Sequence, residues 1–124
     1  TSSRGHFQPI GTDTSFKRGC EKPLFDQQPV EASSTVLACL ETYFLTKDKK
    51  WYAEAEKAFQ WFLGANDLGL SLYDPITGGC CDGIHRDRVN LNQGAESTIA
   101  FLLSLTEMTY VKNLIESLME PISE

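Results

Sequence analysis

The sequence predicts a mainly α-helical protein built of helical hairpins, on three observations. Apolar residues recur at helical spacing from residue 28, and this period is interrupted only at residues 65–93. The predicted helices alternate between ones that are apolar or small on nearly every side and ones with a single apolar stripe. A sequence echo then aligns Gln28 to Glu31 with Gln93 to Glu96, which indicates a repeated helical unit.

The first two helices are expected to form an antiparallel hairpin. Pro29 suits the first position of a helix that ends near Leu45, and the faces of this helix carry many small residues. Because small side chains let neighbouring helices approach closely, we expect this helix to be enclosed. The second helix, about Lys50 to Leu63, has one apolar stripe, and Gly64 follows it as a C-terminal cap. The short connection between the two helices predicts the hairpin.

A second pair of helices is expected near the end of the sequence. Residues 94–108 are apolar nearly all round, which predicts another enclosed helix. Residues 110–119 have one apolar face and are followed by Pro121, which predicts a separate amphipathic helix. Enclosed helices would form an inner ring and amphipathic ones an outer ring. The inner faces of only two such units would need further neighbours.

The segments outside these helices have no helical period. Residues 1–25 are expected to be an irregular N-terminal segment, because glycines and prolines punctuate them. A short β-excursion or ordered loop is expected around residues 70–85. Leu70 to Tyr73 has the composition of a short strand, and Asp82-Gly83 is a tight-turn signal.

Composition limits the classes of partner and site. The net charge of −6 disfavours nucleic acid, because phosphate binding requires positive charge. The near-continuous apolar run at residues 99–105 is too short for a membrane span. The cysteines lack zinc-site spacing, so we expect no metal, no cofactor and a reduced, cytoplasmic setting. We expect Cys80 and Cys81 to pack in the core rather than form a vicinal disulfide. No signal peptide is visible at the start of the sequence.

Several sequence stretches resemble one known family. They are Phe25 to Ala32, Leu72 to Asp74, Thr77 to Gly83 and Val89 to Thr98. Together they resemble the C-terminal end of the (α/α)6 toroid, the six-hairpin-glycosidase-like domain attached to some bacterial group 1 glycosyltransferases. The resemblance covers roughly residues 25–108. It implies that residues 26–124 are the last two hairpins of such a domain, in a fragment of a larger protein.

The resemblance also implies a carbohydrate setting and a polar cavity lined by the inner helices. The sequence contains no nucleotide-sugar-binding glycosyltransferase domain. We therefore expect the parent protein to be a glycosyltransferase and this segment not to catalyse transfer alone. The expected partners are a carbohydrate ligand, the remainder of the parent chain, and a second copy bound through exposed helix faces.

Two glutamates are the leading candidates for the site. Glu31 and Glu96 each occupy the first turn of a predicted enclosed helix, three residues after Gln28 and Gln93. Carboxylates accept hydrogen bonds and amides both donate and accept them, so such a set suits sugar hydroxyls. The alternative interpretation is that each glutamate caps the first amides of its own helix.

Further candidates lie in the loops. Asp82 is grouped with the two glutamates as a candidate catalytic acid, and His85 beside it could act as acid or base. The alternatives are a tight turn for Asp82 and a solvated charge run for residues 85–88. The candidate substrate-binding residues are Asp26, Gln28, Tyr73, His85, Asn92 and Gln93.

Three hypotheses about function follow from these residues. The first is a carbohydrate-associated module that binds or positions a glycan. The second is part of an (α/α)6 glycoside hydrolase, lyase or sugar epimerase that uses paired acids. The third is a non-catalytic helical interaction module whose acidic first turns serve only as caps.

Overall fold

A computed structural model describes residues 2, 4–12 and 16–119 of the chain. The described part is mainly helical: α1 (Pro29–Thr46), α2 (Lys49–Gln60), a 3-10 turn η1 (Trp61–Leu63) and α3 (Ala95–Met119). A two-stranded antiparallel sheet, β1 (Gly83–Ile84) and β2 (Val89–Asn90), lies between η1 and α3 along the chain. The mainly helical class predicted from the sequence is therefore confirmed.

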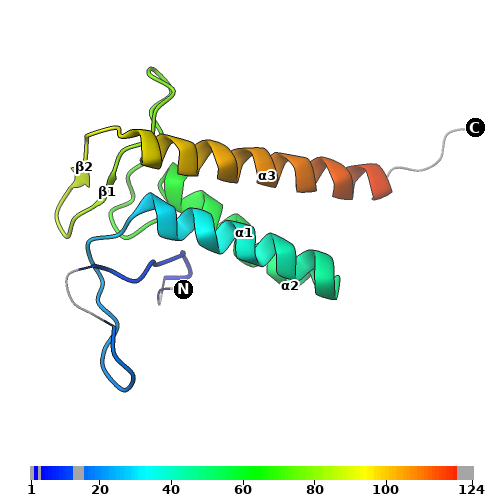
Figure 1. Cartoon of the computed structure of the whole chain (residues 1–124), viewed down its shortest axis with the longest axis horizontal. Coiled ribbons are helices and arrows are strands. Elements are labelled where there is room, and N and C mark those ends of the chain that lie inside the picture. Colours follow the sequence, from blue (N-terminus) through cyan, green and yellow to red (C-terminus); the bar gives the residue numbers. More distant parts are fainter. Residues whose placement is uncertain (1, 3, 13–15, 120–124) are drawn as a thin grey trace, which may run out of the picture.

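The first hairpin is formed as predicted. Lys47 takes a left-handed conformation (φ 59°) and its N–H donates to the Tyr43 carbonyl, which ends α1. The Asp48 carboxylate then accepts from the Lys50 N–H and starts α2. Gly64 follows η1 in the left-handed region, where the sequence predicted a cap. Two residues thus reverse the chain and lay α2 against α1 (Figure 1).

The second hairpin is not formed in the described residues. The two helices expected at residues 94–108 and 110–119 are one continuous helix, α3, of 25 residues. Only Thr109 separates the two expected segments, and neither Gly nor Pro is present there to end a helix. Met108 and Val111 are both buried on the same face, so the core favours continuity across the junction. Pro121 lies outside the described residues.

α1 and α3 lie side by side and run in the same direction, with their N-terminal ends next to the small sheet (Figure 1). α2 runs in the opposite direction to both (Figure 1). α1 buries Ala32, Ser33 and Val36 on one face, but Val30, Ser34 and Leu45 on another face are exposed, so the prediction that this helix is enclosed is wrong within the described residues. The prediction that residues 94–108 are enclosed is also wrong among the described residues, where α3 is covered on one face only. Its exposed apolar residues include Ile99, Leu102, Leu103, Leu105, Tyr110, Leu114, Leu118 and Met119.

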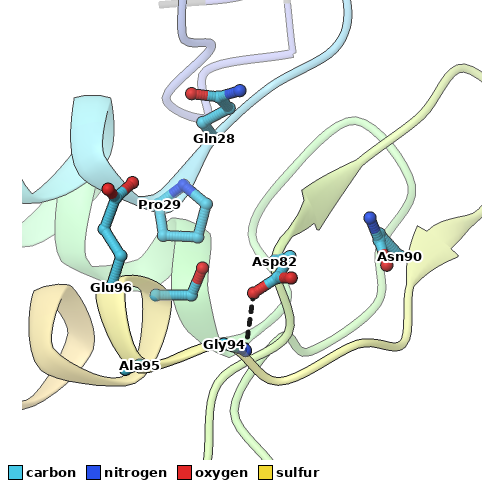
Figure 2. Close-up of a pocket in the computed structure, with 8 residues that line it drawn as sticks. Gln28, Pro29, Asp82, Asn90, Gly94, Ala95 and Glu96 are labelled. Atoms are coloured by element: carbon cyan, nitrogen blue, oxygen red, sulfur yellow. Dashed lines mark hydrogen bonds between the residues drawn. The ribbon is translucent and has the colours of Figure 1, made fainter.

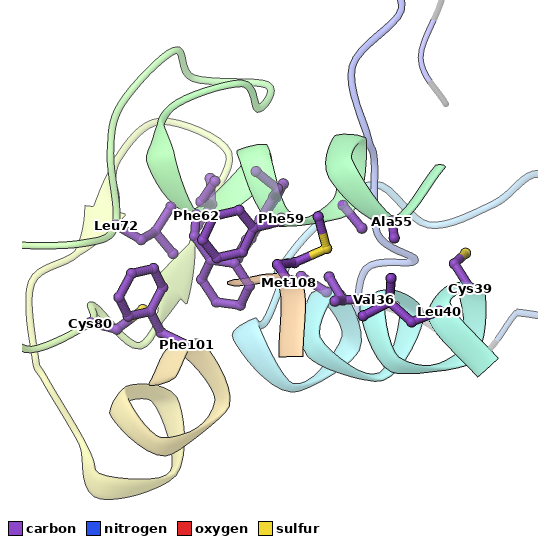
Figure 3. Packing of buried hydrophobic residues seen from close by; sticks show 14 of the residues in the cluster. Val36, Cys39, Leu40, Ala55, Phe59, Phe62, Leu72, Cys80, Phe101 and Met108 are labelled. Atoms are coloured by element: carbon purple, nitrogen blue, oxygen red, sulfur yellow. The ribbon is translucent and has the colours of Figure 1, made fainter. Parts of the chain in front are cut away.

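An aromatic cluster joins α3 to the end of α2. The Phe101 ring stacks on Tyr73, with 4.7 Å between ring centroids, and on Phe59, at 5.9 Å. It also meets Phe62 edge to face at 5.5 Å. Leu72 and Cys80 complete this end of the core (Figure 3).

The cysteines pack as predicted rather than bonding to one another. Cys39, Cys80 and Cys81 are buried free thiols. Burial raises the pKa of the Cys80 thiol to about 12, so it stays protonated and behaves as a small hydrophobe. No helix among the described residues is both long enough and apolar enough to cross a membrane.

The β-excursion is present, but its pairing differs from the prediction. Tyr73 forms only an isolated bridge with Cys80, and the paired strands lie further along the chain. Gly83 is a strand residue, not part of a tight turn, and an added Cβ there would lie 2.5 Å from the Gln27 carbonyl oxygen. Gln27 pairs with Ile84 through two backbone hydrogen bonds of 2.9 Å, so β1 is flanked by β2 and by the segment that enters α1.

A buried polar network holds the N-terminal segment against the helices. The fully buried Gln27 accepts a hydrogen bond from the Trp61 indole (3.0 Å) and donates to the Leu24 carbonyl and the Asp67 carboxylate. Asp67 also accepts from Gln8 (2.8 Å) and contacts His6 Nε2 at 2.6 Å. The described part of residues 1–25 has no helix or strand, as predicted, yet these side-chain contacts fix its path.

The Trp61–Gln27 hydrogen bond gives the first prediction. Trp61→Phe removes the indole N–H and leaves the Gln27 oxygen without a donor in a dry environment. We expect a loss of about 2 kcal/mol in the free energy of unfolding, measured by urea denaturation. Trp51→Phe is the matched control, because Trp51 is half-buried and its indole makes no hydrogen bond within the described residues. Equal losses in the two variants would contradict this role.

Asp67 gives a prediction about pH. Burial raises the pKa of Asp67, but the hydrogen bonds from Gln8, His6 and Gln27 outweigh it, and the net pKa is lowered. A lowered folded-state pKa contributes stability above the unfolded value of about 3.9, and this contribution is lost as pH falls below it. We expect the unfolding free energy of wild type to fall more steeply between pH 5 and pH 3 than that of Asp67→Asn. Asp87→Asn, at an exposed position, should keep the wild-type slope.

Candidate functional site

A pocket of about 400 Å³ lies where the N-terminal ends of α1 and α3 meet the small sheet (Figure 2). Its lining residues come from all three places: Gln28, Pro29, Asp82, Asn90, Gly94, Ala95, Glu96 and Ser97. Two of them are carboxylates, and none is a lysine, arginine or histidine. The arrangement therefore presents hydrogen-bond acceptors and amide groups, and it disfavours an anionic ligand.

The two glutamates from the sequence echo occupy different positions. Glu96 is exposed in the first turn of α3 and lines the pocket, together with Gln28 at the N-cap of α1. Glu31 lies half-buried in the first turn of α1 and is not one of the lining residues. Within the described residues neither carboxylate hydrogen-bonds back to its helix, so the reciprocal cap proposed as an alternative is not formed. The Glu96 carboxylate is thus available to a ligand.

Asp82 lines the pocket but is held by its neighbours. Its carboxylate accepts from the Gly94 N–H (2.7 Å), as Figure 2 shows, and from the Asn92 side-chain amide. These two hydrogen bonds, with a further one from Ser97, lower the pKa of Asp82. Asp82 is therefore ionised at neutral pH and suits the role of an acceptor rather than that of an acid. Asn92 supports Asp82 and does not itself line the pocket.

Gln93 and Tyr73 are directed elsewhere. Gln93 donates to the Asp74 carboxylate (3.1 Å) and accepts from the Thr77 hydroxyl (2.7 Å), so it fastens the loop at residues 74–79 to the start of α3. Tyr73 stacks on Phe101 in the core. Neither residue lines the pocket, because both side chains already serve the packing of the loop.

Asp26 and His85, which the sequence proposed separately, come together. Asp26 Oδ1 lies 3.0 Å from His85 Nδ1, and both side chains remain partly exposed. The two residues are adjacent across the bridge between Gln27 and Ile84. This pairing could not be found from the sequence, because it depends on the register between segments far apart in the chain.

A second polar cluster was missed by the sequence analysis. His6 lines a pocket of about 450 Å³ with Arg4, Gly5, Ala53, Glu56, Lys57, Gln60 and Ala65. Asp67 lies behind His6 and holds it. Neither residue belongs to a periodic or motif-like stretch, and 61 positions separate them. In the described part of the chain, no group of three or more His, Cys, Asp or Glu residues is arranged to hold a metal ion.

Comparison with models of known protein families and with curated proteins finds no match to this chain.

The tie between Asp82 and Gly94 gives a prediction about stability. Asp82→Ala removes the acceptor for the Gly94 N–H directly before α3, so we expect a loss of about 1 kcal/mol in the free energy of unfolding. Hydrogen exchange should speed up at residues 94–98, measured by NMR or mass spectrometry. Asp87→Ala, at an exposed aspartate in the turn between β1 and β2, should change stability by less than about 0.5 kcal/mol. Unchanged exchange in Asp82→Ala would show that this carboxylate does not hold the helix start.

Proposed function

We propose that this protein is a carbohydrate-associated helical module that binds or positions a glycan, and that it forms the C-terminal part of a bacterial glycosyltransferase. The observation that carries the proposal is the convergence of Gln28, Asn90 and Glu96 on one pocket from three separate elements. Such a set of amides and a free carboxylate suits the hydroxyl groups of a neutral sugar, which both donate and accept hydrogen bonds. The absence of cationic side chains from the lining supports a neutral ligand over a phosphate-bearing one.

The helix arrangement supports an origin in an (α/α)6 toroid. α1 and α3 are parallel neighbours and α2 runs antiparallel to them, as inner and outer helices of such a ring would (Figure 1). In this proposal the uncovered apolar face of α3 packs against the remainder of the parent chain. A second copy of this chain is the other partner that the face would accommodate. The proposal places the parent protein in the cytoplasm.

The enzyme hypothesis, a glycoside hydrolase, lyase or epimerase with paired acids, has less support. Asp82 is held as an anion, so the general acid would have to be Glu31 or Glu96. The interaction-module hypothesis is favoured by one observation, the exposed apolar face of α3. It leaves the polar lining of the pocket without a role, and we therefore rank it second.

Sugar binding by the pocket gives the test. Neutral hexoses (glucose, mannose and galactose) and their linear trisaccharides are titrated into the ¹⁵N-labelled chain and followed by NMR. We expect binding to perturb amides at residues 28, 90 and 94–97. Glu96→Ala should weaken binding at least tenfold while leaving the fold intact, because it removes an acceptor that faces the ligand.

Glu116→Ala is the matched control, since Glu116 lies on the same helix outside the pocket lining. Unchanged sugar binding in Glu96→Ala would contradict the role of Glu96 in the pocket, and no binding of any of the sugars by wild type would favour the interaction module. Turnover of a sugar by wild type that falls by orders of magnitude in Glu96→Ala, with binding kept, would favour the enzyme.

A further inference from the structure

The register of the small sheet places four polar residues on one face. Residues opposite one another in an antiparallel ladder share a face, and successive residues of a strand alternate between faces. Gln27 pairs with Ile84, and both are fully buried on the core side. Asp26 and His85 therefore lie on the other side, next to each other. Gly83 pairs with Asn90, which places Asn90 and Gln28 on that same outer face.

This outer face is continuous with the pocket. Gln28 and Asn90 both line the pocket. Asp26 lies two residues before Gln28 on the same face, and His85 lies opposite Asp26. Residues two apart in a strand are about 7 Å from each other, which exceeds the spacing of neighbouring hydroxyls on one sugar ring. Gly83 lies between Gln28 and Asn90 on this face and has no side chain to cover it. Successive rings of an oligosaccharide can therefore contact the two pairs.

The Asp26–His85 pair is suited to hold a hydroxyl group. The Asp26 carboxylate, 3.0 Å from His85 Nδ1, favours a proton on that nitrogen and fixes the orientation of the ring. His85 Nε2 is then the nitrogen left for a ligand, and no described residue hydrogen-bonds it. The Asp26 side chain is 41% exposed and the His85 side chain is 28% exposed, so a ligand can reach both.

We propose that Asp26 and His85 form a second sugar subsite and that the ligand is an oligosaccharide lying across Gly83, with one ring in the pocket and the next on this pair. The inference rests on the proposed function. Within it, His85 makes the contact with the sugar and Asp26 is a positioning residue that acts through His85.

The test compares monosaccharides with trisaccharides in the full chain. Glucose, mannose and galactose and the linear trisaccharide of each are titrated by NMR into wild type, His85→Ala and Asp26→Asn. We expect the trisaccharide that binds to do so about tenfold more tightly than its monosaccharide, a difference of about 1.4 kcal/mol. His85→Ala should lower the trisaccharide affinity to that of the monosaccharide and leave the monosaccharide affinity unchanged. Asp26→Asn should give a smaller loss of the same kind.

Asp87→Ala is the control, because Asp87 is an exposed residue of the turn between β1 and β2 and is not opposite His85 in the ladder. Equal weakening of both ligands by His85→Ala, or no change in either, would overturn the subsite while leaving the proposed function standing. Failure of wild type to bind any of the sugars would overturn both the subsite and the proposed function.

A measurement without sugar tests the positioning role of Asp26. ¹⁵N spectra of the imidazole should show the proton of neutral His85 on Nδ1 in wild type and a shift towards Nε2 in Asp26→Asn; an unchanged distribution would overturn it.

Discussion

The buried amide of Gln27 is the contact on which the arrangement of this protein depends. Its side chain meets the indole of Trp61 at the end of the helical hairpin and the carboxylate of Asp67 in the following loop. Its backbone pairs with Ile84 of the small sheet. A fully buried primary amide is costly unless its donors and acceptor are used. Because the amide and backbone groups of Gln27 bind partners from distant segments, Gln27 fixes the hairpin, the loop and the sheet relative to each other.

The position of the candidate site follows from this constraint. With Gln27 directed into the core, the residues on either side of it, Asp26 and Gln28, are directed to the outer face. Gly83 permits the close approach that the pairing needs, since any Cβ there would collide with the Gln27 carbonyl. Asp82 then ties the sheet to the Gly94 N–H, directly before α3. The pocket therefore lies at a junction of elements that are held in place by the core, by the pairing of Gln27 with Ile84 and by the hydrogen bond between Asp82 and Gly94.

α3 contributes to two environments at once. Its inner face supplies Phe101, which stacks on Phe59 and Tyr73 and closes the core over the hairpin. Its outer face is apolar but uncovered among the described residues. A helix that is hydrophobic all round is usually enclosed. The composition of α3 thus reflects both the neighbours present in this structure and, under the proposed function, neighbours supplied by the parent chain.

The sequence by itself determined the elements whose causes are local. The helical class, the first hairpin with its turn within residues 46–50, and the packing of Cys80 could all be predicted, because spacing, capping and burial preference act over a few residues. The helix break predicted between residues 108 and 110 is wrong, because Met108 and Val111 are buried on the same face and keep one helix continuous. Only the tertiary structure decided which candidates meet. The pairing of Gln27 with Ile84 brings Asp26 to His85, whereas Gln93 and Tyr73 are used in packing, because register and packing depend on contacts between residues far apart in the chain.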